Sequence, residues 1–167
     1  YLDLVLIHWP CPVKDRYVET WEAMIEMQAE GLMRSIGVSN FNDDHIDRIT
    51  AATGVAPVLN QIEVNPKMAN GALRATNAAR GILTQAWTPL GEGKTFSFPH
   101  IADICARTGK SPAQVTLRWH MQLGHSTVTR AESPEHQAEN LDIFDFELTP
   151  EDMAAIAALL GANSTLN

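Results

Sequence analysis

The chain opens with Tyr1-Leu2-Asp3-Leu4-Val5-Leu6-Ile7-His8-Trp9-Pro10, and this stretch decides the fold. Leu4 to Ile7 is an unbroken apolar run, which is typical of a strand that is covered on both faces in a parallel sheet. Pro10 cannot donate a ladder hydrogen bond, so the strand ends before it. His8 is therefore expected at the carboxyl end of a parallel strand, where α/β folds place their ligands.

Strand and helix signals alternate along the rest of the chain. Further strands are expected over 35–40, 58–64, 82–87 and 126–130, and helices over 15–33, from about 42, over 70–80, 99–108 and 111–123, and from about 134 and 150. Three of the helix starts share a capping residue followed by proline, at Ser111, Ser133 and Thr149. This alternation with short connections predicts parallel βα units, and no linker divides residues 1–167, so one domain is expected.

Composition narrows the class of protein. The chain has 167 residues, of which 45% are hydrophobic and 19% charged, as in ordinary globular domains. A net charge of −8 without a basic stripe argues against a nucleic-acid partner. Cys11 and Cys105 lie outside any CxxC spacing, and no apolar run approaches the ~18 residues of a membrane span, so we expect a cytoplasmic protein without a membrane partner.

Polar and aromatic side chains stand where the expected strands end. In a parallel barrel these ends converge on one mouth, which predicts a common site there. The residues concerned are His8, Trp9, Ser39, Asn40, Gln61, Glu63, Trp87 and Arg130.

Six motifs occur in an order and spacing that resemble the aldo-keto reductase family, closest to its 2,5-diketo-D-gluconate reductase type. They are LIHWP, GLMRSIGVSNF, NQIEVNP, WTPLGEGK, SPAQVTLRW and ENLDIFDFELT. The resemblance implies the carboxyl-terminal part, strands four to eight, of a (β/α)8 TIM barrel that lacks its first three βα units. It also implies reduction of a small aldehyde or ketone, such as a keto sugar acid, by hydride transfer from NADPH or NADH.

The resemblance also implies roles for individual residues. His8 would orient and polarise the substrate carbonyl, and Trp9 would line the substrate pocket. The nicotinamide carboxamide would be bound by Ser39, Asn40 and Gln61, with Trp87 stacked on the ring. The stretch from Thr88 to Glu92, with Leu90 and Gly91, would bracket the pyrophosphate; the adenosine phosphate would be bound by Arg130 and His136, and the adenine by Glu139 and Asn140.

The segment around the expected adenosine-phosphate site departs from the family pattern. A helix that opens at Ser133 offers unpaired N–H groups to an anion. However, Ala131 and His136 replace the usual serine and arginine, while Glu132 and Glu135 add negative charge. We therefore expect a weaker preference for the 2′-phosphate than is usual in the family, with NADH competitive with NADPH. Asn65, where the family commonly has histidine, is a further departure.

The family's tyrosine acid and the lysine and aspartate beside it belong to the first three strands. Tyr1 and Tyr17 do not match that motif, so residues 1–167 alone are expected to be nearly inactive, since general acid catalysis contributes ~100 to 10,000-fold. The complete protein is expected to be a monomer. Open barrel edges at Leu4–Ile7 and near Thr127–Thr129 could instead cause this part of the barrel to associate with itself.

Simpler interpretations stand beside these. A histidine at a strand end is more often structural, and Ser39-Asn40 on its own could be a helix-capping turn. Trp21 and Trp119 are expected to be packing residues. The other histidines lack metal-ligand spacing, so no metal is expected and a metal-dependent hydrolase is disfavoured. A catalytically inert half-barrel that binds dinucleotide or a partner subunit is the alternative function.

Overall fold

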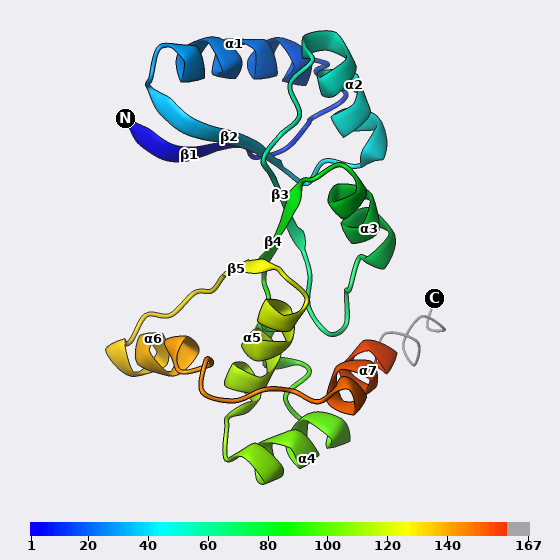
Figure 1. The fold of residues 1–167 in the computed structure, drawn as a ribbon, viewed down its shortest axis with the longest axis vertical. Coiled ribbons are helices and arrows are strands. Elements are labelled where there is room, and N and C mark those ends of the chain that lie inside the picture. Colours follow the sequence, from blue (N-terminus) through cyan, green and yellow to red (C-terminus); the bar gives the residue numbers. More distant parts are fainter. Residues whose placement is uncertain (160–167) are drawn as a thin grey trace. The chain divides into compact units, whose positions relative to one another are not determined.

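A computed structural model describes residues 1–159, in which each strand is followed by one or more helices (Figure 1). The strands are β1 (Leu2–Ile7), β2 (Met33–Ser39), β3 (Leu59–Glu63), β4 (Leu83–Trp87) and β5 (Ser126–Val128). The helices are α1 (Tyr17–Ala29), α2 (Asp43–Thr53), α3 (Gly71–Ala79), the short 3-10 helix η1 (Gly91–Gly93), α4 (Pro99–Thr108), α5 (Pro112–Gln122), α6 (Pro134–Leu141) and α7 (Pro150–Ala158). Each expected strand and helix is present, with ends shifted by a few residues; β5 ends at Val128 rather than at Arg130.

The five strands follow one another in one sheet, in the order β1-β2-β3-β4-β5. β1 pairs with β2 in parallel, and β2 pairs with β3 in parallel, with Ile7 opposite Val38 and Ser39 opposite Gln61. Gly37 makes this pairing possible, because a Cβ on it would lie 2.7 Å from the Leu59 carbonyl oxygen. The register places His8, which follows β1, level with Ser39, the last residue of β2, and with Gln61 in the middle of β3.

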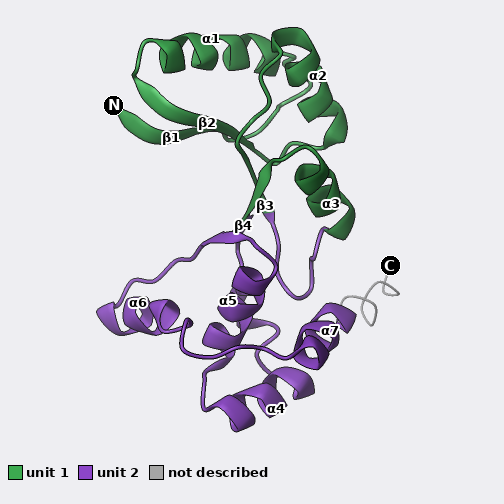
Figure 2. Ribbon diagram, viewed as in Figure 1, with its two compact units in different colours: residues 1–62, 71–85 green, residues 63–70, 86–167 purple. Residues whose placement is uncertain are grey.

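The chain divides into two compact units (Figure 2). Unit 1 comprises residues 1–62 and 71–85, and unit 2 comprises residues 63–70 and 86–167. The core of unit 1 lies between the strands and the helices α1 and α2; its buried members include Trp21, Ile36, Val38, Phe41, Ile46 and Ile49. The prediction of one domain over residues 1–167 stays a prediction, and its last part, residues 160–167, lies outside the described residues.

Unit 2 has buried apolar side chains of its own on α4, α5 and α7, among them Ile101, Val115, Leu117, Trp119 and Ile156. Two helices begin with the expected capping box. The Ser111 hydroxyl accepts from Gln114 N–H while the Gln114 side chain accepts from Ser111 N–H, and Thr149 and Asp152 form the same pair. These reciprocal bonds satisfy helix N–H groups that would otherwise lack partners.

The expectation of a first strand covered on both faces is wrong. Leu2 is 59% exposed and Leu4 is 39% exposed, and burial is reached only at Ile7. Within the described residues β1 is an edge strand with β2 as its neighbour, so its apolar run is only partly covered. Trp21 and Trp119 are buried packing residues, at 0% and 1% exposure, as expected.

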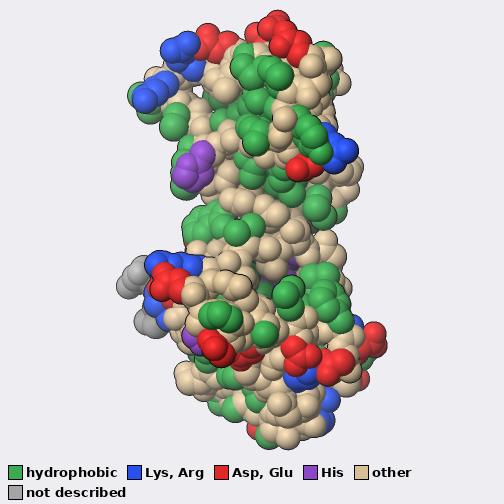
Figure 3. All heavy atoms as spheres, turned by 90° about the vertical axis from the view of Figure 1, so that its left-hand side faces the viewer, with side chains coloured by type: hydrophobic (Ala, Val, Ile, Leu, Met, Phe, Trp, Pro, Cys, Tyr) green, Lys and Arg blue, Asp and Glu red, His purple; other side chains and the backbone are tan. Residues whose placement is uncertain are grey.

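Charged side chains on the face in Figure 3 are interspersed, with blue and red groups next to one another among apolar ones. Many of the basic groups are in ion pairs, such as Arg48 with Asp15 and Arg80 with Asp47. In the part of the chain that the structure describes, no helix combines the length and the apolar character that crossing a membrane requires.

Candidate functional site

Polar groups at the carboxyl ends of β1 and β2 form a row with Gln61 of β3 in unit 1. Ile7 lies opposite Val38, and Ser39 lies opposite Gln61, so the next residue after Ile7, His8, is level with Ser39. The structure brings His8, Ser39, Asn40 and Gln61 together, although Gln61 lies within β3 and not at its end. Their roles in a site stay a prediction.

Hydrogen bonds fix this row. The backbone carbonyl of Gln61 accepts from the Ser39 hydroxyl at 2.9 Å and from Asn40 N–H at 2.9 Å. Asn40 Nδ2 donates to the His8 carbonyl at 3.1 Å and to Ser39 Oγ at 3.0 Å. Asn40 has a φ of 61°, in the left-handed region that asparagine tolerates better than most residues. The Asn40 side chain therefore ties the end of β1 to the end of β2.

A glutamine that the sequence analysis missed holds the Gln61 side chain. Gln61 Nε2 donates to Gln85 Oε1 at 2.7 Å, and both side chains are half-buried. This bond fixes the plane of the Gln61 amide and directs its other end away from Gln85. Gln85 is two residues before Trp87 on β4, and side chains two apart on a strand share a face. That spacing is the signal by which Gln85 could have been found.

His8 and Trp9 stand after the end of β1, where both side chains are exposed. Their ring centroids are 6.1 Å apart with the planes tilted by 44°. An imidazole and an indole in this position present a hydrogen-bonding group beside a flat apolar surface. This combination is suited to a small polar molecule with a carbonyl group.

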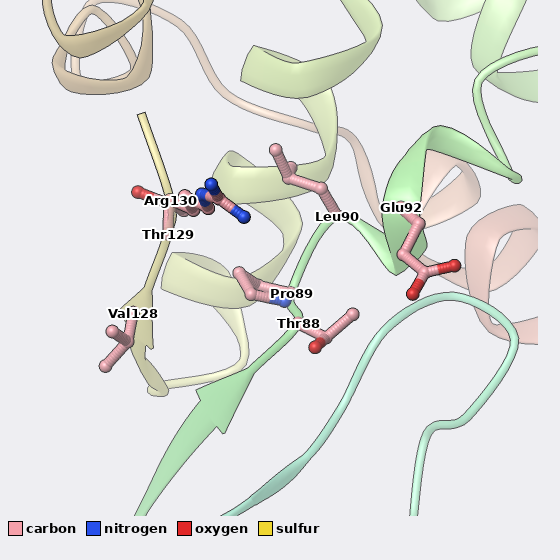
Figure 4. Close-up of a pocket in the computed structure, with 7 residues that line it drawn as sticks. All are labelled: Thr88, Pro89, Leu90, Glu92, Val128, Thr129 and Arg130. Atoms are coloured by element: carbon pink, nitrogen blue, oxygen red, sulfur yellow. The ribbon is translucent and has the colours of Figure 1, made fainter. Parts of the chain in front are cut away.

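A pocket of about 530 Å³ lies in unit 2, which is a normal size for a small-molecule site (Figure 4). One wall comes from the segment after β4, and the other from β5 and the two residues that follow it. The lining residues are Thr88, Pro89, Leu90, Glu92, Val128, Thr129 and Arg130. The structure thus brings Leu90 and Arg130 to one pocket. Gly91, between the lining residues Leu90 and Glu92, is buried.

Charges around this pocket are already paired. The Lys94 ammonium hydrogen-bonds Glu92 and holds the pKa of its carboxyl below the ordinary value, so Glu92 stays ionised near neutral pH. Arg130 forms an ion pair with Glu132 in which both side chains are largely exposed. A phosphate that enters the pocket would therefore compete with two carboxylates for these cations.

The loop from Thr88 to Glu92 has an unusual backbone. Thr88, Gly91 and Glu92 have φ values of 48°, 55° and 56°. Asn65 lies under the loop, because a Cβ on Gly91 would be 3.3 Å from Asn65 Cγ. The Asn65 side chain also donates to Glu63 Oε1 and accepts from two backbone N–H groups of its own turn. Asn65, for which the sequence suggested no role, thus supports one wall of the pocket.

The start of α6 is less open to an anion than the sequence suggested. Ser133 Oγ accepts from His136 N–H at 3.2 Å. The carboxylate of Glu135 is hydrogen-bonded by its own backbone N–H and by the Ser133 hydroxyl, which lowers its pKa. The expectation of unpaired N–H groups is therefore wrong for Glu135 and His136, because side chains of the same helix start accept their hydrogens.

Three further predicted site residues lie elsewhere in unit 2. Trp87 is the last residue of β4 and is half-buried. Glu139 and Asn140 are half-buried on the last turn of α6, and Asn140 lines a second hollow of about 510 Å³ with side chains of α5 and Phe144. Asn140 and Arg130 thus line two different pockets of the same unit.

Within residues 1–159 no group of three His, Cys, Asp or Glu side chains is arranged to hold a metal ion.

The model of the aldo/keto reductase family matches residues 1–160. The chain belongs to this family. Curated relatives include an aldo-keto reductase of Mycolicibacterium smegmatis, 45% identical over 95% of this chain, and the methylglyoxal reductase DkgA of Escherichia coli, also 45% identical over 95% of it. The chain spans 58% of the length of each of these two relatives.

Solved structures of related proteins have the same fold as this chain. Gox0644 in its apo form superimposes with a TM-score of 0.93 and 45% identity, covering 95% of this chain and 59% of Gox0644. A mutant of Gox0644 in complex with NADPH gives a TM-score of 0.92, with 46% identity over 94% of this chain and 58% of the mutant. The predicted fold class is therefore confirmed: this α/β chain of five strands is part of the TIM barrel of the aldo-keto reductases.

Proposed function

We propose that the complete protein carrying this chain reduces a small aldehyde or ketone by hydride transfer from NADPH or NADH. The observation that carries the proposal is the hydrogen-bonded row of Ser39, Asn40 and Gln61 next to His8. A nicotinamide carboxamide has one acceptor and two donors, and such a row of hydroxyl and amide groups complements it. The NADPH complex of a Gox0644 mutant, 46% identical to this chain, supports the same cofactor class.

At the nicotinamide end, the side chains of this chain would bind and orient. The Gln61 amide, held by Gln85, would accept from the carboxamide N–H2 group. Trp87 would cover one face of the ring, so that the other face is presented to the substrate. His8 would hold the substrate carbonyl by a hydrogen bond, and Trp9 would form an apolar wall of the substrate pocket.

At the phosphate end, the loop with Leu90 and Gly91 would lie along the pyrophosphate. Arg130 and His136 would be near the adenosine phosphate, and Glu139 and Asn140 near the adenine. The pocket lined by Leu90 and Arg130 is large enough for one phosphorylated part of a dinucleotide, at about 530 Å³. A nicotinamide dinucleotide is therefore compatible with the residues of this chain.

The cofactor preference follows from the paired charges. A 2′-phosphate would have to displace Glu132 from Arg130, and it would face the ionised Glu135 at the start of α6. NADH has no 2′-phosphate, so its binding requires neither the displacement of Glu132 nor the approach of a phosphate to Glu135. We therefore propose that NADH competes with NADPH in this protein, unlike the strong NADPH preference that is usual in the family.

The substrate is proposed only by class. DkgA, which is 45% identical, is named a methylglyoxal reductase, and a small ketoaldehyde or keto sugar acid would suit an exposed histidine and tryptophan. We propose a monomer for the complete protein and, because Cys11 and Cys105 are free thiols, a reducing cytoplasmic location.

The test uses the complete protein and two cofactors. Quenching of tryptophan fluorescence gives the dissociation constants of NADPH and NADH, and loss of cofactor absorbance with methylglyoxal gives turnover. Dinucleotide binding with turnover supports the proposal, whereas binding without turnover would favour the inert half-barrel. A preference for NADPH above about a hundredfold, roughly 2.7 kcal/mol, would contradict the cofactor argument.

A further inference from the structure

A buried histidine that does not line the pocket forms a hydrogen bond with the pocket wall. His120 on α5 is 0% exposed, and its Nε2 lies 3.1 Å from the carbonyl oxygen of Pro89. A carbonyl oxygen only accepts, so Nε2 must carry the hydrogen and donate it. Pro89 is one of the residues that line the pocket, so this hydrogen bond reaches the wall from behind.

The wall needs such an anchor because its backbone is strained. Thr88 directly precedes Pro89 and has a φ of 48°, which is uncommon for a β-branched residue. Such conformations persist only where the surrounding structure holds them. Within the loop, Gly91 N–H donates to the Thr88 carbonyl and Gly93 N–H donates to the Leu90 carbonyl. The carbonyl between these two, that of Pro89, is the one that His120 binds.

The imidazole of His120 is itself fixed on several sides. It is part of the helix α5, and its ring packs edge to face on Trp119 with centroids 4.7 Å apart. Its Nδ1 lies 3.4 Å from Nδ1 of His125, which is 7% exposed. With Nε2 of His120 carrying a hydrogen, its Nδ1 is an acceptor in the neutral ring, and His125 donates. The donor to Pro89 is therefore held in a set direction.

We propose that His120 is a positioning residue for the dinucleotide: it holds the Pro89 carbonyl, fixes the pocket wall from Thr88 to Glu92, and so sets cofactor affinity without touching the cofactor. This inference rests on the proposed function. Without the anchor, Thr88 can relax and the wall takes its binding geometry only part of the time. If that fraction falls to about one tenth, the apparent dissociation constant rises about tenfold.

The test compares variants of the complete protein by their dissociation constants for NADPH. His120→Gln keeps an N–H donor at the distance of Nε2, whereas His120→Asn is one methylene shorter and cannot reach Pro89. His120→Phe keeps a ring and removes the donor. Thr116→Val is the matched control, because it removes a buried hydrogen bond from the same helix, Thr116 Oγ1 to the Pro112 carbonyl, whose acceptor is not a residue of the wall.

We expect affinity within about twofold of the parent for His120→Gln and Thr116→Val, and about tenfold weaker binding for His120→Asn and His120→Phe, or about 1.4 kcal/mol. The KM for NADPH should rise in the weak variants while kcat at saturating cofactor stays unchanged, since the wall does not contact the reacting atoms. If His120→Phe does not fold, the comparison of His120→Gln with His120→Asn still shows whether the donor to Pro89 sets the affinity for NADPH.

Two results would overturn the assignment. One is parent-like affinity in His120→Asn, and the other is equal loss in His120→Gln and His120→Asn, which would mean that ring packing and not the donor matters. Failure of the parent protein to bind NADPH at all is a different result, because it removes the proposed function on which this inference rests.

Discussion

Replacing Gly37 with alanine should damage both the stability of unit 1 and its cofactor row. The new Cβ would lie 2.7 Å from the Leu59 carbonyl oxygen and 2.7 Å from Leu6 Cδ2. The end of the Leu6 side chain can move, but the Leu59 oxygen belongs to the backbone of the neighbouring strand. Overpacking of this kind costs about 1 to 3 kcal/mol, and we expect the upper end, about 3 kcal/mol, because β2 and β3 must separate.

Urea unfolding of the complete protein measures this cost. With a slope of about 2 kcal/mol per molar urea, a loss of about 3 kcal/mol lowers the midpoint by about 1.5 M. Since Ser39 and Gln61 follow in the same strand pair, NADPH binding should weaken as well. Gly71→Ala is the control: its Cβ would meet no atom within 4 Å, so its stability should stay within about 0.5 kcal/mol of the parent. A Gly37→Ala protein as stable as that control would refute the packing argument.

Three further outcomes are expected. Gly91→Ala, whose Cβ would lie 3.3 Å from Asn65 Cγ at a φ of +55°, should weaken NADPH binding about fivefold to tenfold, whereas Gly109→Ala, with the same backbone region but open space, should leave the dissociation constant unchanged. Burial raises the pKa of the Asp152 carboxyl, but hydrogen bonds from Thr149 and Arg107 outweigh it and hold the pKa below 3.8. The stability gained is present above that pH and is lost as pH falls through the folded pKa, so Asp152→Asn should flatten the decline of the urea midpoint in acid. Glu132→Gln should improve NADPH binding up to about fivefold, the limit for an exposed ion pair, and leave NADH binding unchanged; equal effects on both cofactors would contradict competition for the 2′-phosphate site.

Local chemistry predicted most of the secondary structure. The capping residues Ser111 and Thr149 fix where their helices start, because a side-chain oxygen must take up a helix N–H. The polar residues that end or follow β1 and β2 could be placed together because parallel strands end at a common edge. A capping residue acts on N–H groups only a few residues away, so its effect can be predicted locally. The placement of the strand ends follows from the alternation of strands and helices alone.

The parts that could not be predicted depend on contacts distant in sequence. Asn65 lies 26 residues before Gly91, and nothing in the motif around it indicates that it supports that glycine. His120 meets Pro89 from a helix that begins more than 20 residues later. The apolar run of β1 did not by itself indicate an exposed strand, because such a run has the same pattern at the edge of a sheet as at its centre; the open edge at Leu4–Ile7 was expected only from the family resemblance.

The interleaving of the two units has a consequence for synthesis and for engineering. The chain leaves unit 1 after Ile62, returns at Gly71 and leaves again after Gln85. On the ribosome, the described part of unit 1 therefore cannot be completed until α3 and the first half of β4 have emerged, even though residues of the other unit have already been made. A single proteolytic cut after Gln85 would leave all of unit 1 on one fragment, but that fragment would also carry residues 63–70 of unit 2. A gene fusion that exchanges only the residues of one unit with those of a homologue therefore needs more than one crossover point.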